Sequence, residues 1–403
     1  MELKTRNVNT AFRKLVGYFY HGCEEGLSGP TPVKKSSRNG NVMMIEEPVT
    51  ITYSHPRERV LFNEARDANP HFHLYEGLWM LAGRNDVGSV AYYAKNMLDF
   101  SDDGKTLNGA YGYRWRTVQT PGEQDESMYP AEISRLAWHG QHGGIDQLDI
   151  IVAHLKNDPN SRRAVLQMWN VEDDLLKIGL MKHIELRDAN DPTYRGEMLT
   201  GNPGSKDVCC NLSVMFSLRE TEGMEHLDFG DTYTLKCRYL DITVTNRSND
   251  LVWGLLGANY VHFTMLQEYM AAQLGVAVGK YHHFSNNLHC YEWNWKPEEW
   301  LADSLADGEN FYRCATTGIT PVPLVKDPET FDKEVVEFVQ RHSKDAMATR
   351  YQEPFLNDVA QPLCVAYHHY KRKQYENALA AVQSCKADDW RLAATNWLKR
   401  RMK

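Results

Sequence analysis

The sequence lacks several features that define other classes of protein. No segment approaches the run of about 20 apolar residues that a membrane-spanning helix needs. The N-terminus, MELKTRNVNTAFRKL, has no apolar stretch of the kind that signal peptides carry. The eight cysteines form no C-x-x-C pair and have no dense, regular spacing. We therefore expect a cytoplasmic protein with reduced thiols and no metal site.

Excess positive charge is also lacking. The chain has 53 acidic and 45 basic residues, a net charge of −8, which argues against direct binding of nucleic acid. It has no internal repeat and no low-complexity tract. Its 403 residues, 42% hydrophobic and 24% charged, are ordinary for a globular protein and suffice for a large core. These properties predict a soluble intracellular enzyme or binding protein.

Hydrophobic periodicity indicates a mixed fold of helices and strands. Apolar residues recur at helical spacing in some segments and alternate with polar ones in others. Residues 259–274 are apolar almost all round, which predicts a buried helix that ends at Gly275. The other predicted elements are helices over 9–20 and 148–155 and strands over 42–53, 211–219 and 233–245, the last two joined by an acidic loop over 220–230.

The last part of the chain has a different pattern. From about residue 327 onward the apolar spacing is helical, and it stays so to the basic end, WLKRRMK. We therefore assign residues 1–300 to a mixed α/β domain and residues 301–403 to an α-helical C-terminal extension.

Four arginines lie in three segments that could hold a phosphate. Arg38 lies in a loop with a glycine, Arg162 and Arg163 follow a predicted helix, and Arg247 precedes a serine after a predicted strand. The planar guanidinium group suits phosphate oxygens. Each arginine alone would be an ordinary surface residue, so their meaning depends on the segments around them.

Seven segments stand out for their combination of residue types and for their order along the chain. They are SRNGN (37–41), EGLWMLAGRND (76–86), GAYGYRWR (109–116), DPNSRRAVLQMWN (158–170), VCCN (208–211), NRSND (246–250) and HCY (289–291). Taken in order, these segments resemble the thymidylate synthase family, which includes the pyrimidine nucleotide hydroxymethylases. The resemblance covers about residues 30 to 295, and its spacing is comparable to the family's. It implies an α/β (α+β) fold with one large, mixed, twisted sheet, assembled as a homodimer with shared active sites.

The resemblance also implies a role for individual residues. Cys210 matches the nucleophile, Glu76 and Tyr111 match the pair that organises proton transfer, and Asn211 stands where the family has a catalytic histidine. The implied ligands of a pyrimidine nucleoside monophosphate are Arg38, Arg247 and Ser248 for its phosphate, Arg162 and Arg163 for the phosphate of the partner's nucleotide, and His289 and Tyr291 for the sugar hydroxyl. The implied contacts of the cofactor, 5,10-methylenetetrahydrofolate, are Asp250 and Trp79, although Trp79 is most simply a core aromatic residue.

The chemistry of the pyrimidine ring explains these residue types. Its C5 atom is a poor nucleophile until a thiolate adds at C6, and covalent catalysis then divides one difficult step into easier ones. Positive charge from Arg247 would favour the thiolate form of Cys210. Glu76 would move protons at the polar edge of the base. The neighbouring Cys209, where the family usually has proline, is expected to be a small structural residue.

The chain departs from the synthases at several positions. One change is the segment with Met97 and Phe100 near the usual tryptophans. The polar residues Ser101 and Asp102 follow it and could hold a water molecule. The synthases close over folate with a short apolar C-terminus, whereas this chain continues for about a hundred residues. The other replaced positions are Asn211 for histidine and Asn287 for aspartate.

Counting along the chain leaves two candidates for the residue that reads the base. The family's spacing, counted forward from Arg247, places the base-reading residue at Ala258. The same spacing, counted back from His289, places it at Asn259. One extra residue within 251–257 would reconcile the counts in favour of Asn259. An amide can donate to O4 and accept from N3–H, which suits uracil, whereas an aspartate would suit cytosine. Asn259 therefore favours a uracil nucleotide, and Ala258 leaves the base open.

These observations predict folate-dependent C5 hydroxymethylation of a pyrimidine nucleoside monophosphate, with dUMP favoured over dCMP. Water admitted to the electrophilic intermediate would give the hydroxymethyl product. One alternative is a true thymidylate synthase, which ends in hydride transfer and a methyl group. Another is a catalytically silent nucleotide-binding protein.

Overall fold

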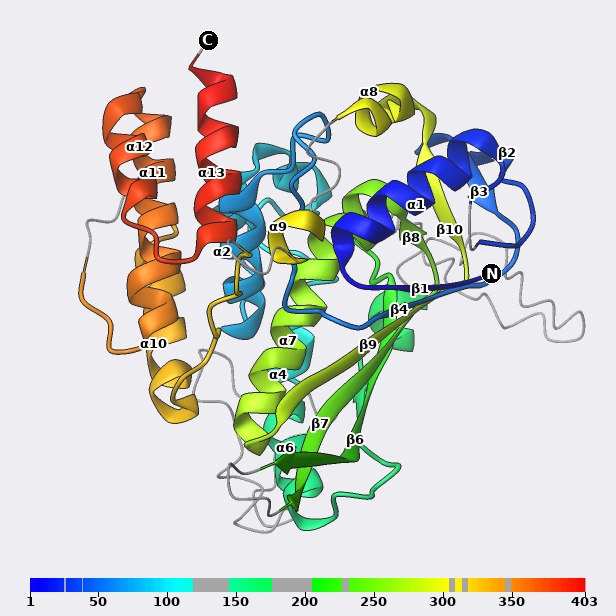
Figure 1. The fold of residues 1–403 in the computed structure, drawn as a ribbon. Helices are drawn as coiled ribbons and strands as arrows, with labels where there is room; N and C mark the ends of the chain where they lie inside the picture. Colours follow the sequence, from blue (N-terminus) through cyan, green and yellow to red (C-terminus); the bar gives the residue numbers. More distant parts are fainter. Residues whose placement is uncertain are drawn as a thin grey trace, which may run out of the picture.

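Two long antiparallel strands, β6 (Asn211–His226) and β7 (Thr232–Asn246), pair along their length in the larger sheet (Figure 1). The prediction of a loop over 220–230 is wrong for residues 220–226, which continue the strand. A cross-strand ion pair between Glu220 and Arg238, 2.6 Å long, offsets the acidic charge in this part of the strand. The computed structural model describes residues 1–24, 27–37, 39–118, 145–175, 205–226, 232–303, 309–313, 318–344 and 349–402.

The strands form two sheets, and the larger one is mixed. Its order is β1-β4-β9-β7-β6-β5, with β1 parallel to β4 and β9 parallel to β7. The smaller sheet has the order β2-β3-β10-β8. This arrangement of a mixed sheet with helices confirms the predicted α/β class. The remaining strands are β1 (Glu2–Thr5), β2 (Val33–Ser37), β3 (Gly40–Ile45), β4 (Val49–Tyr53), β5 (Val165–Gln167), β8 (Asn249–Asp250), β9 (Ala277–Ser285) and β10 (Leu288–Tyr291).

The three helices predicted from periodicity are confirmed as α1, α6 and α7. Gly275 ends α7 in the left-handed conformation, with φ of +68°, which favours glycine. Within the described ranges, no helix is both long enough and apolar enough to cross a bilayer. The helices are α1 (Val8–His21), α2 (Pro70–Leu81), α3 (Val87–Tyr93), α4 (Tyr111–Arg116), α6 (Gln147–Asn157), α7 (Asn259–Leu274), α8 (Pro297–Ala302), α9 (Glu309–Arg313), α10 (Pro328–Arg341), α11 (Gln361–Lys371), α12 (Tyr375–Gln383) and α13 (Asp388–Arg401).

Helix α2 lies at the centre of the molecule, and all twelve of its residues are buried. The Asn69 side chain caps its N-terminus by accepting from the N–H groups of His71 and Phe72, and Pro70 occupies the first helical position. Helix α7 packs on one side of α2, and α10, α11 and α13 of the C-terminal extension pack on the other (Figure 1). The extension therefore covers the side of α2 that faces away from α7.

Several hydrogen bonds fasten the extension to α2 and α3, and three of them join side chains of these helices to backbone carbonyls of the extension. The His71 ring nitrogen Nδ1 lies 2.9 Å from the Leu363 carbonyl, the Tyr75 hydroxyl donates to the Val339 carbonyl at 2.8 Å, and the Tyr93 hydroxyl donates to the His342 carbonyl at 2.9 Å. The helical character of the extension is confirmed, and its side chains belong to the same hydrophobic cluster as those of the first 300 residues. The division at residue 300 stays a prediction.

One glycine allows α4 to approach α2 closely. A Cβ atom built on Gly112 would lie 2.0 Å from the Met80 carbonyl oxygen, so a larger residue would push the two helices apart. Gly112 follows Tyr111, the first residue of α4. The close approach therefore places Tyr111 beside the helix that carries Glu76.

We expect the folded protein to lose stability as the pH falls from 6.5 towards 4. Burial lowers the pKa of His71 to about 4 and that of His342 to about 3. The unfolded chain takes up protons on these rings below about pH 6.5, while the folded chain keeps them neutral, so unfolding becomes more favourable in this range.

Replacing His342 by Phe should reduce this sensitivity to acid. The free energy of unfolding, measured by urea denaturation at pH 7 and pH 5, should fall by about 2 kcal/mol less in His342→Phe than in the unmodified protein. His21 is exposed on α1, so His21→Gln serves as a control and should leave the fall unchanged. An equal fall in all three proteins would show that His342 does not take up a proton on unfolding.

Candidate active site

Seven of the fourteen predicted site residues line two adjoining cavities. The larger has a volume of about 840 Å³ and the smaller about 620 Å³, and Asn39 and Tyr291 line both. The larger is lined by Phe72, Glu76, Asn96, Met97, Asp99, Phe100, Asp250, Trp253, Gly254, Ala258, Asn259 and Trp293, among others. The smaller is lined by Lys35, Ser37, Trp169, Val208, Arg247, Ser248, Asn287 and His289, among others.

The smaller cavity brings together the residues predicted to hold the phosphate and the sugar. Arg247, Ser248, His289 and Tyr291 all line it, and so does Lys35, which the sequence did not single out. The predicted ligand Arg38 lies outside the described residues, although its neighbours Ser37 and Asn39 line this cavity.

Asn287 orients the predicted sugar ligand. Its Oδ1 atom lies 3.0 Å from Nδ1 of His289. An amide oxygen can accept a hydrogen bond from this ring nitrogen, as a carboxylate would. The replacement of aspartate by Asn287 therefore preserves the orientation of His289.

Glu76 has a buried partner that the sequence did not reveal. Its Oε2 atom lies 2.9 Å from Nε2 of His262 on α7, and both side chains are more than nine-tenths buried. Glu76 also lines the larger cavity. The pair thus provides the hydrogen bond that a buried carboxylate requires. His262 follows Asn259 by three residues, which places both on the same side of α7.

Asp250 presents an unused acceptor. One oxygen, Oδ1, accepts from the backbone N–H groups of Val252 and Trp253. The other, Oδ2, is buried and has no hydrogen-bond partner among the described residues. Because Asp250 lines the larger cavity, Oδ2 suits a ligand that carries N–H donors.

The two adjacent cysteines differ in their surroundings. Cys209 is buried, its thiol donates to the Asn211 carbonyl at 3.0 Å, and burial raises its pKa. Cys210 is only partly buried. The Arg247 guanidinium donates to the carbonyls of Cys209 and Val208 at 2.9 and 3.0 Å, so its positive charge lies beside Cys210. This contrast favours Cys210 as the reactive thiol.

Tyr111 lies near this thiol. Burial is the main reason that its pKa is raised well above the ordinary value, and the neighbouring Cys210 raises it further. The Tyr111 ring also stacks on Phe263 of α7, with the ring centres 5.8 Å apart. Of the two residues predicted for proton transfer, Tyr111 is therefore a neighbour of the predicted nucleophile.

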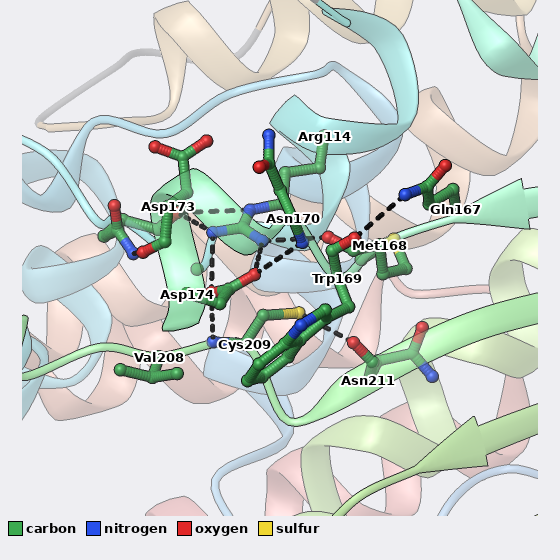
Figure 2. Close-up of polar contacts among 12 residues, drawn as sticks. Arg114, Gln167, Met168, Trp169, Asn170, Asp173, Asp174, Val208, Cys209 and Asn211 are labelled. Carbon is green, nitrogen blue, oxygen red and sulfur yellow. Dashed lines mark hydrogen bonds and ion pairs between the residues drawn. The ribbon is translucent and has the colours of Figure 1, made fainter. Parts of the chain in front are cut away.

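An ion pair holds the chain segment that precedes Cys210, as Figure 2 shows. Arg114 donates to both oxygens of the fully buried Asp174, at 2.5 and 3.0 Å. Asp174 in turn accepts from the backbone N–H groups of Cys209 and Asn170, at 3.1 and 2.9 Å. The bidentate Arg114–Asp174 pair thus links the segment before Cys210 to the segment that follows β5. The sequence did not indicate this pair.

Six of the predicted residues that the structure describes line neither cavity, among them Cys210 and Tyr111. Asn211 is fully buried and fastens β6 to β7, donating to the carbonyl of Thr245 at 3.0 Å and to Asn246 at 2.8 Å. Trp79 is fully buried in the core. Arg162 is exposed before β5, as is the next residue, Arg163.

Ser101 and Asp102, which the sequence suggested as a site for water, make hydrogen bonds within the protein. The Ser101 hydroxyl donates to the Thr106 carbonyl at 2.7 Å, and Asp102 accepts from the Ser205 hydroxyl at 2.6 Å. The polar side chains that line the larger cavity next to Met97 and Phe100 are instead Asn96 and Asp99.

The local backbone accounts for the ambiguity between Ala258 and Asn259. Residues Leu251–Ala258 form a wide π-helical turn, and Gly257 within it has non-helical dihedral angles. Such a turn accommodates one more residue than the same turn of an α-helix. This supports Asn259 as the residue in register, although both residues line the cavity.

Comparison with known proteins agrees with this geometry. The family model described as thymidylate synthase matches residues 33–303. A deoxyuridylate hydroxymethyltransferase of Pseudomonas phage M6 is 37% identical over 408 residues, which cover 99% of this chain and 94% of that protein. Another of the same description, from Bacillus phage SP01, is 34% identical over 244 residues, covering 60% of this chain and 49% of that protein. The chain belongs to the thymidylate synthase family.

Proposed function

We propose that the protein hydroxymethylates C5 of a pyrimidine nucleoside monophosphate and that its substrate is dUMP. The observation that carries the proposal is the position of Cys210, which is partly buried, close to Tyr111 and beside Arg247, a residue that lines the smaller cavity. A purely binding protein has no need for a reactive thiol in this place. The two phage relatives, both described as deoxyuridylate hydroxymethyltransferases, support the same reaction.

The nucleotide would lie across both cavities. Arg247 and Ser248 would hold the phosphate, with Lys35 adding positive charge, and His289 and Tyr291 would bind the sugar hydroxyl. Since Tyr291 lines both cavities, a sugar at this residue would let the base enter the larger one, where Glu76 and Asn259 lie. Arg38 is proposed as a further phosphate ligand.

Each residue of the site then has a chemical task. The Cys210 thiolate adds to C6 of the base, and the positive charge of Arg247 stabilises the thiolate. The addition gives C5 carbanion character. Glu76, held by His262, exchanges a proton with O4 as negative charge develops there. Tyr111 lies where it could assist removal of the C5 proton.

The residues of the larger cavity fit 5,10-methylenetetrahydrofolate as the cofactor. The unpartnered Oδ2 of Asp250 would accept from the N–H groups of a pterin, and the aromatic rings of Phe72, Trp253 and Trp293 would contact its flat rings. When bound, this cofactor supplies the one-carbon unit. Trp79 is left out of this assignment because its side chain is fully buried in the core.

Asn96 and Asp99 favour a hydroxymethyl product. They line the cavity wall together with Met97 and Phe100, where aromatic side chains would otherwise exclude water. Once tetrahydrofolate has left and C5 carries an exocyclic methylene, a water molecule held there would add to that methylene, and its oxygen would become the new hydroxyl. Expulsion of the Cys210 thiolate from C6 would then restore the double bond between C5 and C6. This outcome needs no hydride transfer, in contrast to methylation by a thymidylate synthase.

We also propose a homodimer with shared active sites. Arg162 and Arg163 are exposed and line neither cavity of their own subunit as described, so they are free to reach the phosphate of a partner's nucleotide. The adjoining outer face of the larger sheet has exposed apolar side chains on β5 and β6, with Val165 45% and Met215 39% exposed. An isologous contact would bury this face on both subunits.

The reaction itself is tested by weighing its product. The protein is incubated with methylenetetrahydrofolate and, separately, with dUMP, dCMP, UMP or CMP. We expect dUMP alone to gain the mass of one CH2O unit, without the rise in absorbance that accompanies dihydrofolate. A gain of one CH2 unit with equal dihydrofolate would make the protein a thymidylate synthase, and no product from any nucleotide would refute the proposal.

The role of each cysteine is tested by a matched pair of variants. Cys210→Ser should reduce tritium release from C5 of the labelled nucleotide by about 10³-fold or more, because a hydroxyl is a far weaker nucleophile than a thiolate. Binding of dUMP should survive, since the side chains are similar in size. Cys209→Ser is the control and should keep most of the activity. The reverse pattern would assign the nucleophile to Cys209.

The shared site is tested by mixing two inactive proteins. Arg163→Ala and Cys210→Ala subunits, exchanged under mild denaturation, should form heterodimers in which one site carries both substitutions and the other carries neither. Each heterodimer should therefore have half the activity of an unmodified dimer, and because random exchange makes half of the dimers heterodimers, an equal mixture should recover about a quarter of the unmodified activity. A monomer in sedimentation experiments, or no recovery after proven exchange, would contradict the shared site.

A further inference from the structure

A line of buried polar groups leads from the wall of the larger cavity into the core. The Asn259 amide nitrogen donates to Oδ1 of Asn249 at 3.1 Å, and Nδ2 of Asn249 lies 2.8 Å from Nε2 of His283. The other ring nitrogen, Nδ1, lies 2.6 Å from the Tyr281 hydroxyl. His283 and Tyr281 are fully buried and Asn249 is 3% exposed. We call Asn249, His283 and Tyr281 the amide relay.

The contact between the two amides depends on a glycine. A Cβ atom at Gly254 would lie 2.2 Å from Oδ1 of Asn249 and 3.2 Å from Nδ2 of Asn259. Any side chain at this position would therefore push the two amides apart. Gly254 belongs to the same wide turn that brings Asn259 into register. The turn thus both places Asn259 and leaves room for the relay.

The donor and the acceptor of each hydrogen bond in the relay can be assigned. Burial lowers the pKa of His283 to about 3, so the ring is neutral, with one nitrogen donating and the other accepting. Because Nδ2 of Asn249 faces Nε2, that nitrogen accepts, and Nδ1–H donates to the Tyr281 hydroxyl. Oδ1 of Asn249 is then left to accept from Asn259.

This assignment determines what Asn259 offers to the cavity. One N–H of its amide is engaged by Asn249, so Oδ1 and the second N–H are available to a ligand. An acceptor beside a donor matches the N3–H and O4 of uracil. If every donor and acceptor of the relay were exchanged, Oδ1 of Asn259 would accept from Asn249. Asn259 would then present only N–H donors to the ligand. Those would oppose the N3–H of uracil.

We propose that the amide relay is a specificity-determining device, in which Asn249, His283 and Tyr281 orient the Asn259 amide to select uracil over cytosine. The inference rests on the proposed function, in which Asn259 reads the base. Asn249, His283 and Tyr281 are positioning residues, since they act on the base through Asn259.

The experiment removes the hydroxyl at the far end of the relay. In Tyr281→Phe the Nδ1–H of His283 has no acceptor, so the ring loses its preference for this tautomer and the amides lose their fixed direction. Tyr53→Phe is the matched control, since Tyr53 stacks on Tyr281 with ring centres 5.3 Å apart and its hydroxyl has no hydrogen-bond partner among the described residues. Dissociation constants for dUMP and dCMP are measured by titration calorimetry.

We expect the unmodified protein and Tyr53→Phe to bind dUMP more tightly than dCMP, by the same ratio. In Tyr281→Phe this ratio should fall by about tenfold, the loss of roughly one well-placed hydrogen bond. Asn259→Asp, which alters the reading group itself, should abolish or reverse the preference. A ratio in Tyr281→Phe equal to that in Tyr53→Phe would overturn the relay and leave the proposed function intact. A preference for dCMP in the unmodified protein would instead refute the proposed substrate.

A second variant restores the direction without the hydroxyl. In Tyr281→Phe combined with Asn249→Asp, a carboxylate replaces the middle amide, and it can only accept hydrogen bonds. Asn259 must then donate to it, as in the unmodified protein. The preference for dUMP should return in the double variant, provided that circular dichroism shows it folded. A folded double variant without this preference would count against the relay.

Discussion

The burial of the Glu76 carboxylate is the constraint on which the rest of the site depends. Removing a charged or polar group from water is costly unless a hydrogen bond replaces the lost hydration. Glu76 lies on α2, whose residues are all buried, and His262 supplies the replacement from α7. The two helices must therefore keep their relative position for the carboxylate to stay at the cavity wall.

The C-terminal extension contributes to this constraint from the other side of α2. Its helices α10, α11 and α13 pack against α2, and the His71 and Tyr75 side chains of α2 make hydrogen bonds to backbone carbonyls of the extension. Bonds to backbone groups define where a helix lies, because the carbonyl cannot move without its own helix. The extension therefore supports the side of α2 that faces away from α7.

The pairing of β6 with β7 supplies the other half of the site. Asn211 pairs with Asn246, so the residues just beyond each strand end, Cys210 and Arg247, are neighbours, and the Arg247 N–H donates to the Cys210 carbonyl at 2.9 Å. The Arg114–Asp174 pair then holds the chain before Cys210. Cys210, the proposed nucleophile, and the neighbouring Arg247 are thus positioned by backbone contacts.

The sequence by itself determined the elements and the chemistry whose signals are local. The helix ending at Gly275, the strand before Arg247 and the ordered motifs around Cys210, Glu76 and His289 could all be read from neighbouring residues, since spacing and residue type carry that information. The tertiary structure alone decided which polar groups meet. His262 with Glu76, Asp174 with Arg114, and His283 with Asn249 join residues from 34 to 186 positions apart, and no local pattern encodes such pairs. The extent of β6 beyond residue 220 and the wide turn before Asn259 were likewise decided by strand pairing and packing, which outweigh local preference.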